Sequence, residues 1–253
     1  KLFTRGSLGM PKSWNYSEPL LFKRGESYME FNKEGNDIIL KAYFPKAKKG
    51  KGIKANIQLS IKQNSDLIAN IIPFKDPTAF VYAQKINCML PNGEVRIGDK
   101  NYVFNHENDS YGVLDWTRSV FPYKNSWKWC SASGKLNNKL FGFNLDYGFG
   151  AESSKNMLFY DGVGHHLDEI KYLIDWKNPK NPIKILADDD RVNLILTPVY
   201  FSIEGVNLGL IRMQGAMVYG FFIGYVQLDN GEKLEIKETD RLFGWAENFY
   251  QRW

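Results

Sequence analysis

The sequence predicts an all-β, antiparallel fold, and three observations support this prediction. Aromatic residues make up 15% of the 253 residues and glycine is frequent, whereas long runs of helical period are missing. Apolar and polar residues alternate with period two in many segments. Turn signals separate these segments at intervals of roughly ten residues, a spacing typical of β-sandwiches and β-barrels.

Segment 53–62 shows the alternation most clearly. The apolar side chains of one face are Ile53, Ala55, Ile57, Leu59 and Ile61. Because successive side chains of a strand point to opposite faces, this pattern predicts a strand with one buried and one solvated face. Segments 27–35, 36–45 and 81–91 follow the same pattern and are also expected to be strands.

The second part of the chain repeats this design. Hairpin turns are expected at Asn137-Asn138, Asp161-Gly162 and Asp229-Asn230-Gly231. Only the ending, 241–253, is expected to be a short helix, because Leu242, Trp245, Ala246 and Phe249 share one side at helical spacing. We therefore expect an N-terminal β half over 1–110 and a C-terminal β half over 111–253.

The distribution of charged and apolar residues along the chain indicates whether the protein binds nucleic acid or crosses a membrane. The net charge of +5 is concentrated in the lysine-rich segment 46–54, where no aromatic residue offers a stacking platform. A solvated hairpin loop explains this segment better than a nucleic-acid contact does. The longest apolar run, 216–226, is too short to span a bilayer and suits a buried strand. We expect neither nucleic acid nor a membrane span.

The only two cysteines are Cys88 and Cys130, without the spacing of a metal site. Free thiols in a reducing compartment are expected, and with no visible signal peptide a cytoplasmic location follows. The oligomeric state is not predicted by these patterns.

Several motifs resemble one protein family. They are YAQKINC, GVLDWTRSVFPYKNSWKWCSASG, GFNLDYGFG, KNMLFYDG, HHLDEI, LDNGEKLEIK and GWAENFYQRW. Over the chain from about Gly9 they are similar to a bacterial family called domain of unknown function 2804. That family is more distantly similar to tandem lipocalin-like proteins, which include carotenoid 1,2-hydratases. The resemblance implies two lipocalin-like β-barrel or sandwich halves packed side by side, the first lacking its initial strands, but it implies no reaction.

The candidate site lies between residues 111 and 168. This segment contains three of the seven tryptophans and two of the three histidines, interleaved with Asp, Asn and Gly. Buried Asp and Asn require hydrogen-bond partners, so such a mixture is costly in an ordinary β-core. A segment that breaks the local rules in this way is where a site is expected.

Asp115 is the first candidate for a catalytic carboxylate. It stands next to Trp116 and three residues before Arg118. An apolar neighbour raises the pKa of a carboxyl group and a guanidinium lowers it, and either effect can tune a general acid or base. The alternative is an Asp115–Arg118 pair that holds a turn at the rim of a sheet.

Trp116 and Arg118 are candidates for substrate binding, and five further residues are as well. Trp127 and Trp129 share one strand face and either line a pocket or belong to the core. Asn144 and Tyr147 can orient a ligand, although the asparagine can instead satisfy edge backbone. Asn156 lies near the next hairpin, where Asp161 is a turn residue rather than a catalyst.

His165 is the second candidate for acid–base chemistry, in a relay with a carboxylate. Adjacent His165 and His166 point to opposite faces of a strand, and three histidines in total do not assemble a zinc site. No P-loop, dinucleotide fingerprint or nucleophile elbow is present in the sequence. We therefore expect no metal and no cofactor.

Three functions remain open. The first is a cofactor-free acid–base enzyme (hydratase, lyase or hydrolase) that acts on a small amphipathic or carbohydrate-like molecule. The second is a non-catalytic carrier or sensor of a hydrophobic small molecule. The third is an interaction module in which the tryptophans are core. A cavity that contains Asp115 favours the first, an apolar cavity the second and a packed interior the third.

Overall fold

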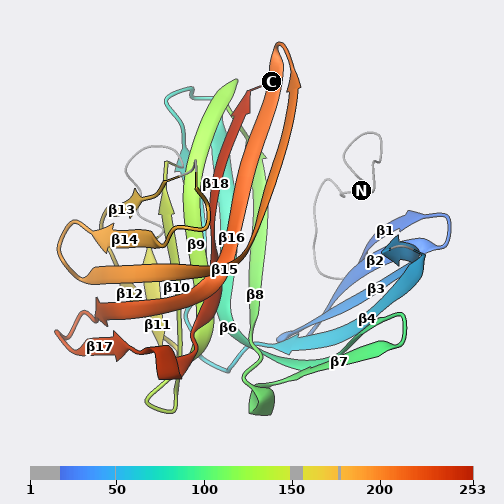
Figure 1. Cartoon of the computed structure of the whole chain (residues 1–253), viewed down its shortest axis with the longest axis horizontal. Coiled ribbons are helices and arrows are strands. Elements are labelled where there is room, and N and C mark those ends of the chain that lie inside the picture. The colour runs from blue at the N-terminus through green and yellow to red at the C-terminus, as the bar shows by residue number, and fades with distance from the viewer. Residues whose placement is uncertain (1–17, 49, 149–155, 176–177, 253) are drawn as a thin grey trace. The chain divides into compact units, whose positions relative to one another are not determined.

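The computed structural model describes residues 18–48, 50–148, 156–175 and 178–252, and these residues form eighteen strands and two short 3-10 helices (Figure 1). The strands of both sheets pair antiparallel, for example β3 with β4 and β9 with β10. The predicted all-β, antiparallel fold is confirmed.

Eight strands form the first sheet. They are β1 (Leu20–Arg24), β2 (Ser27–Glu34), β3 (Asp37–Lys48), β4 (Lys51–Ser60), β5 (Ile68–Pro73), β6 (Phe80–Ile97), β7 (Lys100–Asn105) and β8 (Gly112–Val120). The helix η1 (His106–Asn108) follows β7. The chain has two compact units, and the long strand β6 is divided between them after Cys88.

The first unit comprises residues 1–63 and 89–112. In it β1 to β4 form a meander, and the second part of β6 continues the sheet beside β4. Gly93 is required at this junction: its φ is +155° and a Cβ atom there would lie 2.2 Å from the Asn56 carbonyl oxygen. The expected strands at 27–35, 36–45 and 53–62 are present as β2, β3 and β4.

The second unit comprises residues 64–88 and 113–253. Its main sheet has ten strands. They are β9 (Lys124–Leu136), β10 (Lys139–Tyr147), β11 (Met157–Tyr160), β12 (Val163–His166), β13 (Ile170–Leu173), β14 (Ile183–Ala187), β15 (Val192–Leu208), β16 (Ile211–Gln227), β17 (Lys233–Ile236) and β18 (Phe243–Arg252). The helix η2 (Glu238–Asp240) precedes β18.

The prediction of a short helix over 241–253 is wrong. Residues 243–252 form β18, which lies between β9 and β16 and pairs with both. The apolar spacing fits a helix, but aromatic residues also favour strands, and two flanking strands satisfy the backbone hydrogen bonds of β18. Tertiary pairing therefore decides the conformation of this segment.

An apolar core fills the inner face of the ten-stranded sheet. Phe141, Phe143 and Phe222 are fully buried there, and the sheet curls until the Tyr172 hydroxyl of β13 donates a 2.7 Å hydrogen bond to the Leu145 carbonyl of β10. The described side chains thus pack the interior at the centre of this sheet.

Candidate functional site

The candidate site lies on the outer face of the ten-stranded sheet, opposite the apolar core. In β9, Cys130 points into the core, so Trp127 and Trp129 point to the outer face. In β18, Glu247 is directly opposite Trp129 in the pairing register, and Phe249 is opposite Trp127. Paired residues share a face, and this arrangement places a carboxyl group among aromatic rings.

Strands β6 and β8 supply an ion pair to this face. Lys85 is buried, and its Nζ lies 3.0 Å from Oδ1 of Asp115 and 3.7 Å from the centroid of the Trp129 ring. The Asp115 side chain is 35% exposed and also accepts a 3.1 Å hydrogen bond from Thr117 Oγ1. A buried ammonium group is thereby neutralised by a carboxylate that keeps contact with water.

Asn87 fixes β6 on the sheet. Its Nδ2 donates to Ser131 Oγ at 2.8 Å and to the Phe143 carbonyl oxygen at 3.0 Å. Asn87 lies two residues after Lys85, on the same face of β6, so these bonds hold the lysine over Trp129.

Glu247 is a partly buried carboxyl group of the site. Its Oε1 accepts a 2.6 Å hydrogen bond from Trp127 Nε1. Burial raises the pKa of Glu247, the Trp127 bond and the charge of Lys85 lower it, and the charge of Asp115 raises it. Burial prevails, so Glu247 holds a proton at a higher pH than an ordinary glutamic acid.

The two tryptophans of β9 have packing partners. The Trp127 ring stacks with Phe121 at 5.9 Å and with Phe249 at 5.2 Å between centroids. Trp129 donates a 2.6 Å bond to Asn144 Oδ1 and meets Trp245 edge-on. These contacts orient the charged groups and favour a supporting role over stacking on a ligand.

Other predicted residues lie around this cluster. Strand alternation places Trp116 and Arg118 on the face of β8 opposite Asp115, whose ion-pair partner in the structure is Lys85. Asn144 is fully buried beneath Trp129.

Two further predicted residues have other surroundings. Asn156 is buried and bridges backbone: its Oδ1 accepts from the Asp146 N–H at 2.6 Å and its Nδ2 donates to the Asp168 carbonyl at 2.8 Å. Tyr147 is exposed, with Lys128 Nζ 4.8 Å from its ring centroid. Their proposed roles in binding stay predictions.

The structure does not bring His165 to Asp115. His165 pairs with Leu158 in the sheet and therefore lies on the core side, opposite the face of Trp129. Its Nδ1 accepts a 3.3 Å hydrogen bond from the Asp229 backbone N–H, and the Asp229 carboxylate binds Arg191 through Oδ1 at 2.6 Å. His165 thus belongs to a different cluster.

Sequence reasoning missed Lys85 and Glu247. Lys85 occupies a position at which the alternation of Val81 and Ala83 calls for an apolar side chain. Glu247 alternates with Trp245 and Phe249 once the segment is read as a strand. A charged residue among apolar side chains on one face of a strand is the signal in both cases.

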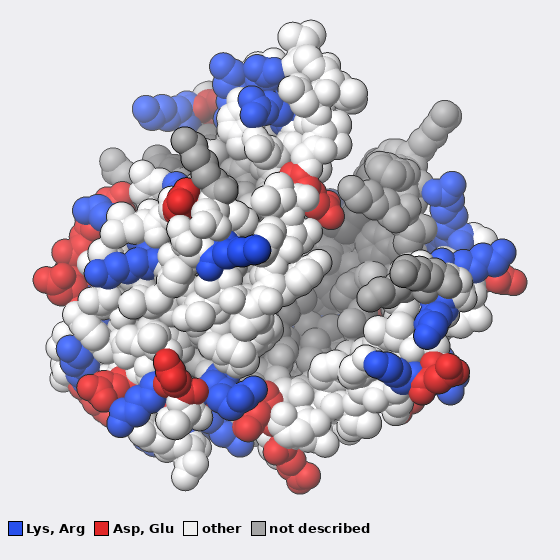
Figure 2. All heavy atoms as spheres, in the orientation of Figure 1, with Lys and Arg blue, Asp and Glu red and all other residues white. Residues whose placement is uncertain are grey.

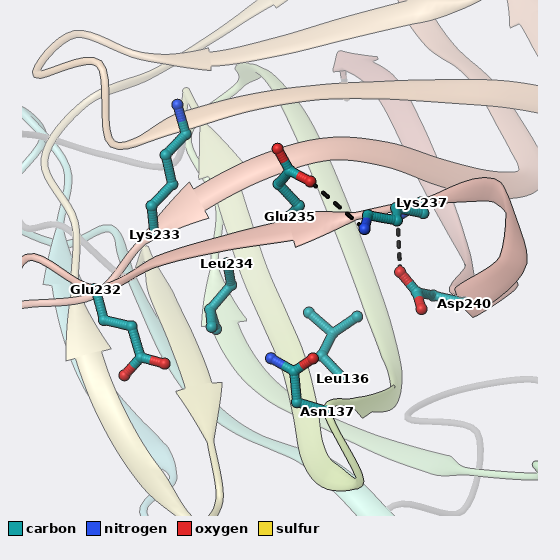
Figure 3. Close-up of a pocket in the computed structure, with 8 residues that line it drawn as sticks. All are labelled: Leu136, Asn137, Glu232, Lys233, Leu234, Glu235, Lys237 and Asp240. Atoms are coloured by element: carbon teal, nitrogen blue, oxygen red, sulfur yellow. Dashed lines mark hydrogen bonds and ion pairs between the residues drawn. The ribbon is translucent and has the colours of Figure 1, made fainter.

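A hollow elsewhere on the second unit is lined by none of the residues predicted for the functional site (Figure 3). It has a volume of about 430 Å³ and lies beside β17 and the β9–β10 turn. Its charged groups are solvated; the Lys237–Glu235 pair, for example, spans 3.8 Å with both side chains more than two-thirds exposed. Hydrated charges of this kind are weakly coupled, so this hollow offers less chemistry than the Lys85 cluster.

Surface charge gives no single-sign field on the side shown in Figure 2, where lysine and arginine alternate with acidic side chains over the second unit. In the described ranges, no three His, Cys, Asp or Glu residues come together in a group that can hold a metal ion. A search of the same ranges found no helix long and apolar enough to cross a membrane.

Comparison with known proteins gives a family but no function. The model of the family "Domain of unknown function (DUF2804)" matches residues 1–253, in agreement with the motif resemblance. No curated protein matches the sequence. This chain is 10% identical in sequence to the protein in the crystal structure of CghA with Sch210972. The two structures align with a TM-score of 0.48, over 92% of this chain and 69% of that chain. A Nitrosomonas europaea protein described as an AttH is 10% identical, with a TM-score of 0.47 over 90% of this chain and 69% of its own.

Proposed function

Because the chain belongs to the DUF2804 family, whose description states no activity, we propose its function from the site: a cofactor-free acid–base enzyme acting on a small molecule. The observation that carries this proposal is that Glu247, with a raised pKa, belongs to the same cluster as the Lys85–Asp115 ion pair. Two carboxyl groups in different environments are the arrangement that separates a proton donor from a proton acceptor.

The roles follow from the surroundings of each group. Glu247 is the proton donor, because burial stabilises its neutral form and Trp127 fixes the direction of its carboxyl group. Asp115 is the proton acceptor, because it contacts an ammonium group and a hydroxyl and part of it remains open to solvent. Lys85 compensates negative charge that develops beside it.

Such a pair supports reactions that add or remove water. In a hydration, Asp115 takes a proton from the attacking water while Glu247 gives a proton to the other end of the double bond. In an elimination the same two groups act in reverse, and in a hydrolysis Glu247 protonates the leaving group. A small amphipathic or carbohydrate-like substrate is compatible with a site built of carboxyl groups and aromatic rings.

The carrier function is the second candidate, and the packing of the core weighs against it. A carrier of a hydrophobic molecule needs an empty apolar interior. The described interior of the ten-stranded sheet is instead occupied by fully buried side chains such as Phe141, Leu194 and Phe222. A packed interior also fits the interaction module, and what favours the enzyme over that module is the cluster of Lys85, Asp115 and Glu247 on the outer face.

The test is a substrate search that assumes only the reaction class. The wild-type protein is incubated with a fractionated metabolite extract, and mass spectrometry follows compounds that gain or lose the mass of one water. Glu247→Gln and Asp115→Asn are expected to abolish the conversion while both variants remain folded by circular dichroism, although the loss of the Asp115 charge beside the buried Lys85 lowers the melting temperature. Glu235→Gln, which changes an exposed glutamate outside the site, is the matched control. Conversion that survives both site variants would overturn the proposal, and retention of a compound without conversion would establish the carrier.

A further inference from the structure

The tip of the β15–β16 hairpin exposes an unusual number of apolar side chains. Those that are 41–78% exposed are Ile203, Val206, Leu208, Leu210, Ile211 and Met213. Single exposed apolar residues are ordinary on protein surfaces, but six in one hairpin are the kind of concentration that marks a binding surface. The register places the pairs Val206–Met213 and Leu208–Ile211 on one face, whereas Ile203 lies on the other face.

The pairing of β15 explains why the core does not cover this tip. Strand β14 pairs with β15 only from Asn193 to Leu196. Within the described residues, the rest of β15 up to Leu208 has only β16 as a neighbouring strand. The turn itself is held in place, because Tyr123 Oη donates to the Leu210 carbonyl and Arg252 donates to the Gly209 carbonyl. The apolar tip is therefore presented on an ordered turn.

A row of three cations lies at the base of the tip. Arg212 is directly opposite Arg252 in the pairing of β16 with β18, and Arg252 is directly opposite Lys124 in the pairing of β18 with β9. Like charges in opposed positions of a sheet destabilise it unless an anion compensates them.

Among the described residues, no acidic side chain forms an ion pair with these three cations. Arg212 bonds to the Gln214 side chain and lies over the Tyr250 ring, and Arg252 bonds to a backbone carbonyl. The acid on the same hairpin, Glu204, is paired with Gly215 in the register, three positions away from Arg212 along β16. Figure 2 shows the uncharged tip at the top of the view, with basic side chains beside it.

We propose that the tip of the β15–β16 hairpin inserts into the surface of a bilayer that contains anionic lipids. The six apolar side chains enter the boundary between headgroups and acyl chains, and the phosphates of the lipids compensate Arg212, Arg252 and Lys124. Insertion of an apolar element flanked by cations is the usual mode of binding to a membrane surface, and it is distinct from crossing the membrane.

A second copy of the chain is a less suitable occupant of the tip. A two-fold contact buries the same patch on both copies, which would bring two rows of three cations close together. An anionic lipid surface removes this repulsion, so charge complementarity favours the membrane.

Vesicle sedimentation tests the proposal with the full chain. The protein is mixed with vesicles of phosphatidylcholine alone, or with phosphatidylglycerol added. We expect binding to the mixed vesicles, weakened by salt. Leu208→Ser with Leu210→Ser is expected to reduce the binding more than about tenfold, because two exposed leucines no longer enter the bilayer. Arg212→Gln is expected to reduce it about fivefold, and only on the anionic vesicles.

Val163→Ser with Leu173→Ser is the matched control, because these two exposed apolar residues lie on other strands of the same unit. Circular dichroism checks that each variant is folded. Failure of the wild-type protein to bind mixed vesicles would overturn the proposal, as would an equal loss in the control. Light scattering provides the other decisive outcome: a dimer that Leu208→Ser with Leu210→Ser dissociates would identify a second copy as the occupant.

Discussion

Lys85 and Asp115 form a 3.0 Å ion pair in which the lysine side chain is 5% exposed and the aspartate side chain 35% exposed. The asymmetry is informative, because an ammonium group that is buried to this degree depends on its partner, whereas the carboxylate can be hydrated. A pair of this kind that only stabilised the fold would be replaceable by apolar side chains. Its position beside Glu247 is what makes it a candidate for chemistry.

The first prediction concerns the electrostatic coupling in this cluster. Lys85→Met is expected to raise the pKa of Glu247, because the lysine charge lowers it, and Asp115→Asn is expected to lower the pKa, because the aspartate charge raises it. Carbon-13 NMR titration of the glutamate carboxyl groups measures both shifts, and the spectrum of Glu247→Gln assigns the resonance. Shifts of the same sign in the two variants would contradict the arrangement.

The second prediction follows from the raised pKa of Glu247. Because the folded protein holds this proton more tightly than the unfolded chain, Glu247 contributes stability below its ordinary pKa of 4.5 and loses that contribution as the pH rises through its raised value. Relative to Glu247→Gln, whose amide oxygen can still accept from Trp127, the free energy of unfolding of the wild type is expected to fall over this window. Urea titrations of both proteins at a series of pH values measure the difference, and a difference that does not change with pH would exclude burial of the charge.

The strands were largely predictable from the sequence, since their signal is local. Alternation over 53–62 and the turn at Asp161-Gly162 correspond to β4 and to the β11–β12 hairpin. The ending was not predictable, because the apolar residues of 241–253 fit a helix and a strand equally well. Its pairing with β9 and β16 depends on segments distant in the sequence.

The site was predictable only in part, for the same reason. Asp115 and the two tryptophans of β9 were identified by their local composition, but Lys85 and Glu247 join them from β6 and β18. The sequence suggested Arg118 as the partner of Asp115 because it is close along the chain. Strand alternation places it on the opposite face, which leaves the position beside Asp115 to a lysine of another strand.

A third prediction concerns the thiols. Cys88 and Cys130 are both free and buried, and burial raises the pKa of each to about 12. Because the thiolate is the reactive form, neither is expected to react with a thiol reagent at neutral pH in the folded protein, and both are expected to react in denaturant. Rapid modification of either cysteine in the native protein would show that this part of the sheet opens locally.

The last prediction tests the packing that supports Glu247. A Cβ atom at Gly215 would lie 2.1 Å from the Phe249 ring, which in turn stacks on Trp127. The ring cannot move away without disturbing this stack, so Gly215→Ala is expected to lower the free energy of unfolding by about 1–3 kcal/mol. It is also expected to change the near-ultraviolet circular dichroism of the tryptophan.

Gly205→Ala is the matched control, because on the neighbouring strand β15 the nearest atom to its Cβ would be 3.4 Å away. This variant is expected to stay within about 0.5 kcal/mol of the wild type. Since Trp127 donates the bond that fixes Glu247, Gly215→Ala should also shift the pKa of this glutamate upward as the bond weakens, and Gly205→Ala should not. Equal stability of the two variants would mean that Phe249 is free to move, and the stack would then not be what orients Glu247.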